Sequence, residues 1–231
     1  GEVLDALDRL NLTDQTLVVF SSDNGPARAG RGTRLESMHD SATGKGFNIA
    51  AAKGITGGRK GYKAALFEGG VGVPFIARWP GRIAAGKTDK TSIFSAVDLL
   101  PTFCEIAGVK LPGTYQPDGV SQVGTLKGKG QPLREKPLFW KMAAPWPARK
   151  TKPDHWVSYA VVHQNWKLVS NRDADYVELY DLVTDPLEKN DLKEKHPATI
   201  KELTKMLEQW QATLPARPSG RVFSNLRNPQ K

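Results

Sequence analysis

The sequence places an aspartate and an asparagine, Asp23 and Asn24, two serines after the short apolar run at 16–20. Their carboxylate and amide oxygens are hard ligands, which suit Ca²⁺ or Mg²⁺ far better than zinc or copper. Calcium takes about six to eight oxygens, so these two residues would supply only part of a site. The sequence Asp-Asn-Gly is also favourable turn chemistry after a strand. Spacing alone therefore leaves a metal site and a simple turn as alternatives.

A second set of candidate residues lies in a basic segment ahead of a double glycine. Lys63 precedes Glu68 and Gly69-Gly70, and Arg59 and Lys60 stand just before it. A lysine near the mouth of a parallel sheet can hold a sulfuryl or phosphoryl oxygen and stabilise charge on the leaving oxygen. The alternative is a solvated basic loop. Two roles fit Glu68 equally well: a catalytic acid, or a partner of the backbone amides in the double-glycine turn.

The four histidines do not form a zinc motif, because no pair has the His-x-x-x-His spacing. His155 stands next to Trp156 in a polar stretch, where a sugar contact and a surface or capping residue are the alternatives. The single cysteine, Cys104, has no partner for an internal disulfide. Gly-x-Ser-x-Gly, Walker-type and dinucleotide-binding motifs are absent from the sequence.

Apolar periodicity predicts the elements that must position these residues. Residues 3–10 have helical spacing, 16–20 and 75–79 are strand-like, and 93–107 form a helix that Gly108 caps. A continuously apolar strand is typical of a parallel sheet that helices cover on both faces. Ligands gather beyond the carboxyl ends of such strands. The pattern therefore puts Asp23 and Asn24 at the ligand-binding edge of a sheet.

The second half of the sequence has a different character. Three β-rich runs at 157–162, 166–170 and 176–182 predict an antiparallel meander. A single apolar stripe between Pro197 and Pro215 predicts a helix over 197–214. We expect this helix to pack on one face of the meander.

Composition excludes some classes of function. With 231 residues and 39% hydrophobic content, the chain is long enough for one substantial core or for a large lobe and a small one. The net charge of +9 is concentrated in residues 26–90, which contain 12 Lys and Arg against 4 acids. The segment lacks the aromatic interleaving and motifs of a nucleic-acid binder, so we expect no nucleic-acid partner. No apolar run approaches the roughly 18 residues of a membrane span.

Several motifs in one order resemble the sulfatase family, relatives of alkaline phosphatase that use formylglycine and calcium. Residues 16–25 read Thr-Leu-Val-Val-Phe-Ser-Ser-Asp-Asn-Gly, and 62–70 read Tyr-Lys-Ala-Ala-Leu-Phe-Glu-Gly-Gly. Val-Gly-Val-Pro-Phe-Ile-Ala-Arg-Trp-Pro-Gly and Val-Asp-Leu-Leu-Pro-Thr-Phe follow. Further on, Trp-Lys-Leu-Val, Glu-Leu-Tyr-Asp-Leu and Thr-Asp-Pro-Leu-Glu resemble the antiparallel C-terminal subdomain of the same family. The likeness spans about residues 1–214.

The resemblance assigns roles to three residues. Asp23 and Asn24 match the second pair of calcium ligands in the family, and Lys63 matches the lysine that contacts the sulfate. Lys63 is preferred to Lys60 because it stands at the family's usual distance before Glu-Gly-Gly. The other calcium ligands and the Cys/Ser-x-Pro-Ser-Arg motif that yields formylglycine are expected upstream. The 231 residues contain no such motif, and Cys104 stands in a different context.

The fold that the resemblance implies is α/β: the C-terminal end of a mostly parallel αβα sandwich, then a small antiparallel sheet with a terminal helix. We divide the chain into an α/β part at 1–111 with a long basic loop at 26–61, a connection at 112–137, an antiparallel subdomain at 138–215 and a basic tail at 216–231.

The implied activity is hydrolysis of sulfate esters, with a sulfated sugar or an aryl sulfate as substrate. Arg59, which precedes Lys63 in the basic segment, is a further candidate substrate contact. This chain is expected to be inactive alone. A phosphodiester or phosphonate hydrolase and a non-catalytic binding module are the alternatives. The family implies an exported location, periplasmic, secreted or lysosome-like, although no signal peptide is visible in this sequence. It implies no particular sugar or oligomeric state.

Overall fold

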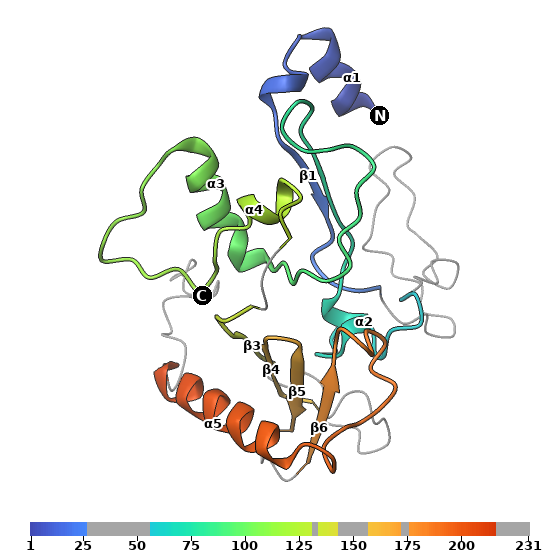
Figure 1. Ribbon diagram of the computed structural model, residues 1–231, viewed down its shortest axis with the longest axis vertical. Coiled ribbons are helices and arrows are strands. Elements are labelled where there is room, and N and C mark those ends of the chain that lie inside the picture. The colour runs from blue at the N-terminus through green and yellow to red at the C-terminus, as the bar shows by residue number, and fades with distance from the viewer. Residues whose placement is uncertain (27–55, 131–133, 143–156, 172–175, 216–231) are drawn as a thin grey trace, which may run out of the picture.

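The computed structural model describes residues 1–26, 56–130, 134–142, 157–171 and 176–215. Its elements in chain order are α1 (Glu2–Arg9), η1 (Thr13–Gln15), β1 (Val18–Ser21), α2 (Glu68–Val71), β2 (Phe75–Arg78), η2 (Ala96–Asp98), α3 (Leu99–Ala107), α4 (Val123–Leu126), β3 (Leu138–Lys141), β4 (Tyr159–His163), β5 (Trp166–Ser170), β6 (Val177–Asp181) and α5 (Pro197–Thr213). Figure 1 shows their arrangement. None of the helices in these ranges is long and apolar enough to cross a membrane.

β1 and β2 form a two-stranded antiparallel sheet, in which Val18 faces Arg78 and Ser21 faces Phe75. The sequence predicted that this first strand is buried on both faces, but within this chain it is not. Phe20 is 63% exposed and its cross-strand neighbour Ile76 is 59% exposed. A sheet of two strands has too few covering elements to bury both of its faces.

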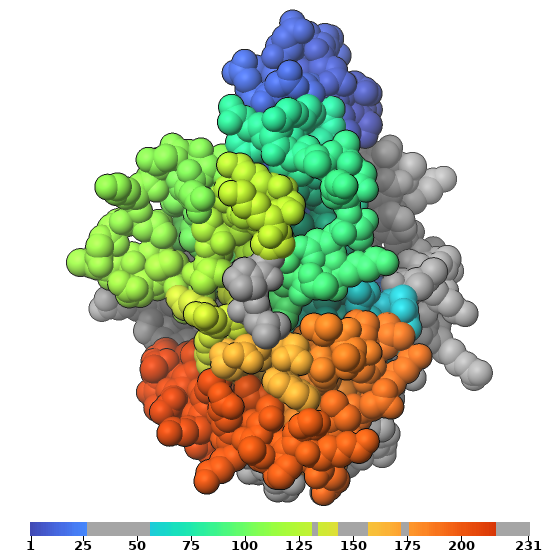
Figure 2. Space-filling view, viewed as in Figure 1, coloured from blue at the N-terminus to red at the C-terminus, as the bar shows by residue number. Residues whose placement is uncertain are grey.

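The first helix forms as its spacing predicts but lies at the edge of the molecule. α1 has no buried residue, and Val3 is 70% exposed although it belongs to the apolar stripe. Figures 1 and 2 show α1 projecting at one end of the molecule, beyond β1. The apolar stripe of α1 therefore has little to pack against in this chain.

The second sheet is antiparallel, with strand order β3-β4-β5-β6. Its three later strands are those that the sequence predicted, and β5 has the predicted bounds. A two-residue turn joins β4 to β5, and Gln164 in that turn has φ 54°, as tight hairpins require. β3 was not predicted, because its four residues follow a proline and show no clear alternation. It pairs with β4 and widens the meander to four strands.

One face of this sheet carries α5, as the sequence predicted. Leu168 and Leu179 pack with Leu203 and Leu207 of the helix in a buried cluster. At the edge of this cluster, the ring of Trp210 stacks on Phe139 with 5.0 Å between centroids. The apolar stripe of α5 is therefore the side that holds the helix on the sheet.

The opposite face of the sheet carries the segment just before α2, which the sequence did not predict. The three residues 65–67 are buried against Ala160, Val169 and Tyr180. The Phe67 ring meets the Tyr180 ring edge-on, at 6.5 Å between centroids. Figure 1 shows α2 and α5 on different sides of the sheet. The C-terminal sheet is thus packed directly against the segment that bears Lys63.

A buried ion pair holds the N-terminal end of α3. Asp98 and Arg134 form two hydrogen bonds of 2.9 and 2.8 Å, and their side chains are 0% and 1% exposed. Asp98 also closes a capping box with Ser95 at the start of η2. Gly108 ends α3 in the left-handed region at φ 66°, as predicted.

Candidate functional site

Asp23 and Asn24 lie in the loop that follows the carboxyl end of β1. Asp23 is exposed and Asn24 is half-buried. The Ser22 hydroxyl donates to the Asn24 carbonyl oxygen at 2.9 Å and lies 3.5 Å from the Asp23 carboxylate. The backbone bends at these two residues, and the Asp23 carboxylate is open to a ligand.

The next residue, Gly25, docks this loop onto α2. Its backbone N–H donates to the Gly70 carbonyl oxygen at 2.8 Å. A Cβ atom at position 25 would lie 1.9 Å from the Gly69 carbonyl oxygen, so only glycine allows this approach. The absence of a side chain at Gly25 thus lets the Asp23 loop approach the backbone of α2.

Lys63 is carried by a tight turn that lies beside the same loop. The Ala65 N–H donates to the Tyr62 carbonyl oxygen at 2.9 Å and closes the turn. Ala64 has φ 70°, a conformation that costs a residue with a side chain about 1–3 kcal/mol and persists only where the surroundings impose it. The Lys63 N–H donates to the carbonyl oxygen of Pro26 at 2.9 Å. The backbone of Lys63 is therefore bonded to Pro26, which lies three residues after Asp23 in the sequence.

The two neighbouring lysines differ in their surroundings. Lys60 Nζ lies 2.6 Å from Glu178 Oε2 and 2.9 Å from the Tyr180 hydroxyl, and 4.2 Å from the centroid of the Phe67 ring. Lys63 is exposed, and its ammonium forms no ion pair with the described part of the chain. Of the two, Lys63 is the lysine that is open to an anionic ligand.

The structure tests neither of the two further predicted contacts, Arg59 and His155. Arg59 is exposed, and its N–H donates to the Thr56 carbonyl oxygen at 3.4 Å. His155 lies outside the described residues, as do positions 27–55 of the predicted basic loop and the predicted tail at 216–231. The roles of Asp23, Asn24, Lys63, Arg59 and His155 stay predictions.

Sequence reasoning missed a buried lysine between two carboxylates. Lys167 of β5 has a fully buried side chain, and its Nζ lies 2.8 Å from Glu68 Oε1 and 2.8 Å from Glu188 Oε1. The Glu68 N–H donates to Glu188 Oε2 at 2.6 Å. Glu68 thus pairs with Lys167 and not with the amides of the double-glycine turn. A lysine inside the apolar run Trp-Lys-Leu-Val was the signal that could have revealed it.

Electrostatics keep this lysine charged. Burial alone would lower the pKa of Lys167, but the carboxylates of Glu68 and Glu188 outweigh burial and raise the pKa above 10.5. Burial also raises the pKa of the Tyr180 hydroxyl, and its bond to Glu178 adds to that effect. Both groups keep their protons in the folded chain at a pH where the unfolded chain loses them.

Alkaline pH is therefore expected to destabilise the chain. The contribution of Lys167 is fully present below its unfolded pKa of 10.5 and is lost as the pH rises through the higher folded value. Each such group lowers the free energy of unfolding by up to about 1.4 kcal/mol per pH unit in that window. Urea unfolding between pH 8 and pH 11.5 measures how the free energy of unfolding changes with pH. Replacing Lys167 and Glu188 together by methionine should flatten this dependence, and an equal slope in that variant would contradict the assignment.

The donor set at the loop fits a hard cation in part. Asp23 and Asn24 offer oxygen ligands, as calcium prefers. The described residues contain no group of three or more His, Cys, Asp or Glu that could hold a metal ion. The described residues therefore do not supply a cluster of three carboxylates for a calcium ion at this loop.

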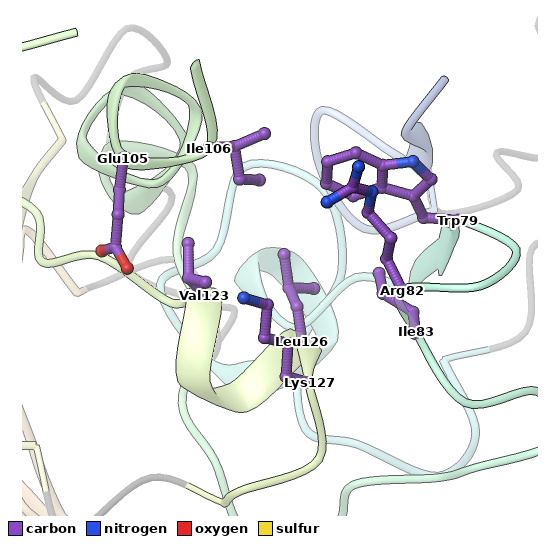
Figure 3. A pocket seen from close by; sticks show the side chains of 8 residues that line it. All are labelled: Trp79, Arg82, Ile83, Glu105, Ile106, Val123, Leu126 and Lys127. Carbon is purple, nitrogen blue, oxygen red and sulfur yellow. The ribbon is translucent and has the colours of Figure 1, made fainter. Parts of the chain in front are cut away.

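A pocket elsewhere in the molecule does not coincide with this loop. It lies between the end of β2, α3 and α4 (Figure 3), and its lining consists of Trp79, Arg82, Ile83, Glu105, Ile106, Val123, Leu126 and Lys127. The Arg82 guanidinium lies over the Trp79 ring at 5.0 Å from the centroid. None of the predicted site residues lines it.

Comparison with known proteins identifies related families. Residues 59–213 match the family profile "N-sulphoglucosamine sulphohydrolase, C-terminal", and residues 1–109 match the profile "Sulfatase". An N-acetylgalactosamine-6-O-sulfatase of Bacteroides thetaiotaomicron is 29% identical over 222 residues, which cover 90% of this chain and 39% of that protein.

Two solved structures resemble the fold. BT33336S-sulf, from work on the metabolism of multiple glycosaminoglycans by Bacteroides thetaiotaomicron, superposes with a TM-score of 0.65 and 26% identity, over 92% of this chain and 42% of that one. BT4656, solved in complex with its substrate D-glucosamine-2-N,6-O-disulfate, gives a TM-score of 0.58 and 25% identity, over 92% and 37%. The chain thus spans about two fifths of the length of each of these proteins.

Proposed function

Because the chain belongs to the sulfatase family, we propose that it forms part of an enzyme that hydrolyses sulfate esters of carbohydrates. Relatives that act on sulfated amino sugars support this substrate class. The observation that carries the proposal is the backbone docking of the Asp23 loop onto the Lys63 turn. The backbone bonds Gly25–Gly70 and Lys63–Pro26 join the segments that carry Asp23, Asn24 and Lys63, which supports the proposal.

In this proposal each residue of the chain has a distinct task. Asp23 and Asn24 supply two oxygen ligands to Ca²⁺, which as a Lewis acid would polarise the sulfuryl oxygens. Lys63 binds a sulfuryl oxygen and stabilises the charge that develops as the ester bond to the leaving oxygen breaks. The Lys63 turn and the Asp23 loop keep these groups in place before the substrate binds, so little reorganisation is needed during the reaction. The attacking group, formylglycine in the family, is proposed to come from another segment.

We also infer that the 231 residues alone have no turnover. They contain no Cys/Ser-x-Pro-Ser-Arg motif. Apolar side chains such as Phe20, Ile76, Leu100 and Phe103 are 43–63% exposed. We propose that these faces of the β1–β2 sheet and of α3 pack against further parts of a longer enzyme. A sulfatase assay of the isolated chain with Ca²⁺ tests this, and measurable turnover that Lys63→Ala removes would contradict it.

The preferred ester distinguishes this proposal from the alternative hydrolase. The complete protein is expected to have a kcat/KM for an aryl sulfate at least about 100-fold above that for the matching aryl phosphate diester or phosphonate, a difference of about 2.7 kcal/mol. Chelation of calcium should abolish the activity, and Asp23→Ala should raise the calcium concentration that restores it. Preference for the phosphate diester would support the phosphodiester hydrolase, and turnover of neither ester would support a binding module. Processing of an export signal in the complete protein would test the proposed exported location.

A further inference from the structure

We propose that Lys167 and Glu188 are positioning residues of this site. They hold α2, and α2 in turn holds both the Asp23 loop and the Lys63 turn. The inference rests on the proposed sulfatase function, although the geometry that supports it involves only residues of this chain. In this proposal the C-terminal antiparallel sheet contributes to catalysis indirectly, by positioning the site and not by contacting the substrate.

The first step is the attachment of α2 to the sheet. Glu68, the first residue of α2, is bound at two points: its carboxylate accepts from Lys167 at 2.8 Å, and its N–H donates to Glu188 at 2.6 Å. Lys167 and Glu188 are themselves paired at 2.8 Å, and both side chains are fully buried. Two directional bonds to one residue fix the position and the orientation of this end of the helix.

The second step is the attachment of the site to α2. The Gly69 N–H donates to the Lys60 carbonyl oxygen at 2.6 Å, and the Gly70 carbonyl accepts from the Gly25 N–H at 2.8 Å. A Cβ at Gly69 would lie 2.2 Å from the Gly61 carbonyl oxygen, and one at Gly70 would lie 2.1 Å from that of Ala65. Backbones in such close contact cannot shift separately. A displacement of α2 therefore moves the Lys63 turn and the Asp23 loop together.

A second attachment supports the same turn. Lys60 reaches across to Glu178 at 2.6 Å, and the Tyr180 hydroxyl also donates to that carboxylate at 2.5 Å. The Lys60 backbone N–H donates to the Leu187 carbonyl oxygen at 3.3 Å, next to Glu188. The segment 60–68 is thus attached to the sheet at both of its ends, and the turn with Lys63 lies between them.

Packing alone does not explain this arrangement. A buried ion pair contributes little net stability, and apolar residues of similar volume often replace one without loss. What an apolar replacement cannot supply is a directional bond to the Glu68 N–H and carboxylate. Small displacements of positioned groups lower activity strongly, by about 10–100-fold for residues that orient catalytic ligands.

The test uses the complete protein with Lys167→Met and Glu188→Met together, which remove the ion pair at similar volume and with no change in net charge. We expect kcat for a sulfated substrate to fall about 10–100-fold, with a smaller change in KM. Independently of activity, the amides of Gly25 and Lys63 should exchange with deuterium faster. If this variant does not fold, the second variant is Lys167→Met with Glu188→Gln, which keeps an acceptor for the Glu68 N–H. Its kcat should fall less than that of the double methionine variant.

The matched control is Leu168→Ala. Leu168 is the next residue of β5, but it packs on the opposite face in the cluster with α5. Its truncation should lower the melting temperature without changing kcat or exchange at Gly25 and Lys63. The inference is overturned if the double variant keeps wild-type kcat and wild-type exchange at both amides, or if Leu168→Ala loses kcat equally. If the wild type hydrolyses no sulfate ester, the proposed function fails, and the exchange data still decide whether Lys167 and Glu188 hold the loops.

Discussion

Lys63→Ala is expected to lower kcat of the complete enzyme by about 10²–10³-fold and to leave the free energy of unfolding within about 0.5 kcal/mol of wild type. The side chain is exposed and pairs with no carboxylate of the described residues, so its removal breaks no packing. What is lost is the positive charge that stabilises the sulfuryl group in the transition state. Steady-state kinetics with a sulfate ester and urea unfolding measure the two quantities.

Two other lysines provide matched controls for this prediction. Lys60, three residues earlier, pairs with Glu178 and lies over Phe67, so Lys60→Ala should cost about 1–3 kcal/mol of stability. Lys87 is exposed, so Lys87→Ala should change neither stability nor kcat. The assignment of Lys63 fails if Lys63→Ala retains kcat within about threefold, or if it unfolds as readily as Lys60→Ala.

Gly25→Ala is expected to have the largest effect of any single methyl group added to the site. The new Cβ would lie 1.9 Å from the Gly69 carbonyl oxygen and 2.8 Å from its carbon, both backbone atoms. The loop must therefore move away from α2 and lose the bond between the Gly25 N–H and Gly70. Overpacking of this kind costs about 2–4 kcal/mol. Because Asp23 and Asn24 move with the loop, calcium affinity of the complete protein should fall about tenfold or more.

Gly124→Ala is the control for Gly25→Ala. Gly124 lies inside α4, and a Cβ there would meet nothing within 4 Å. The same substitution should therefore stabilise the chain by about 0.5–1 kcal/mol, because alanine is the better helix former. Urea unfolding and calorimetric titration with calcium measure both variants. Equal calcium affinity in Gly25→Ala and wild type would show that the contact of Gly25 with α2 does not position the metal ligands.

The elements that the sequence predicted well are those with strong local periodicity. α5 begins at Pro197 and ends at Thr213, and β5 has its predicted bounds, because a sustained apolar stripe or a β-rich run encodes its own geometry. The prediction failed where burial depends on other segments. The run ending at Phe20 was expected to be buried on both faces, yet its residues are only half-buried and Phe20 is exposed, because burial depends on elements packed above and below the strand.

The sequence by itself determined the residue types of the candidate site: hard oxygen ligands at Asp23 and Asn24 after a strand, and Lys63 ahead of a double glycine. Only the tertiary structure decided that these segments share one edge, because backbone hydrogen bonds between distant residues join them and leave no pattern in side-chain types. It also decided the role of Glu68, whose partner Lys167 lies 99 positions away. A carboxylate looks alike in sequence whether it acts on a substrate or pairs with a buried lysine, and only the position of its partner separates the two.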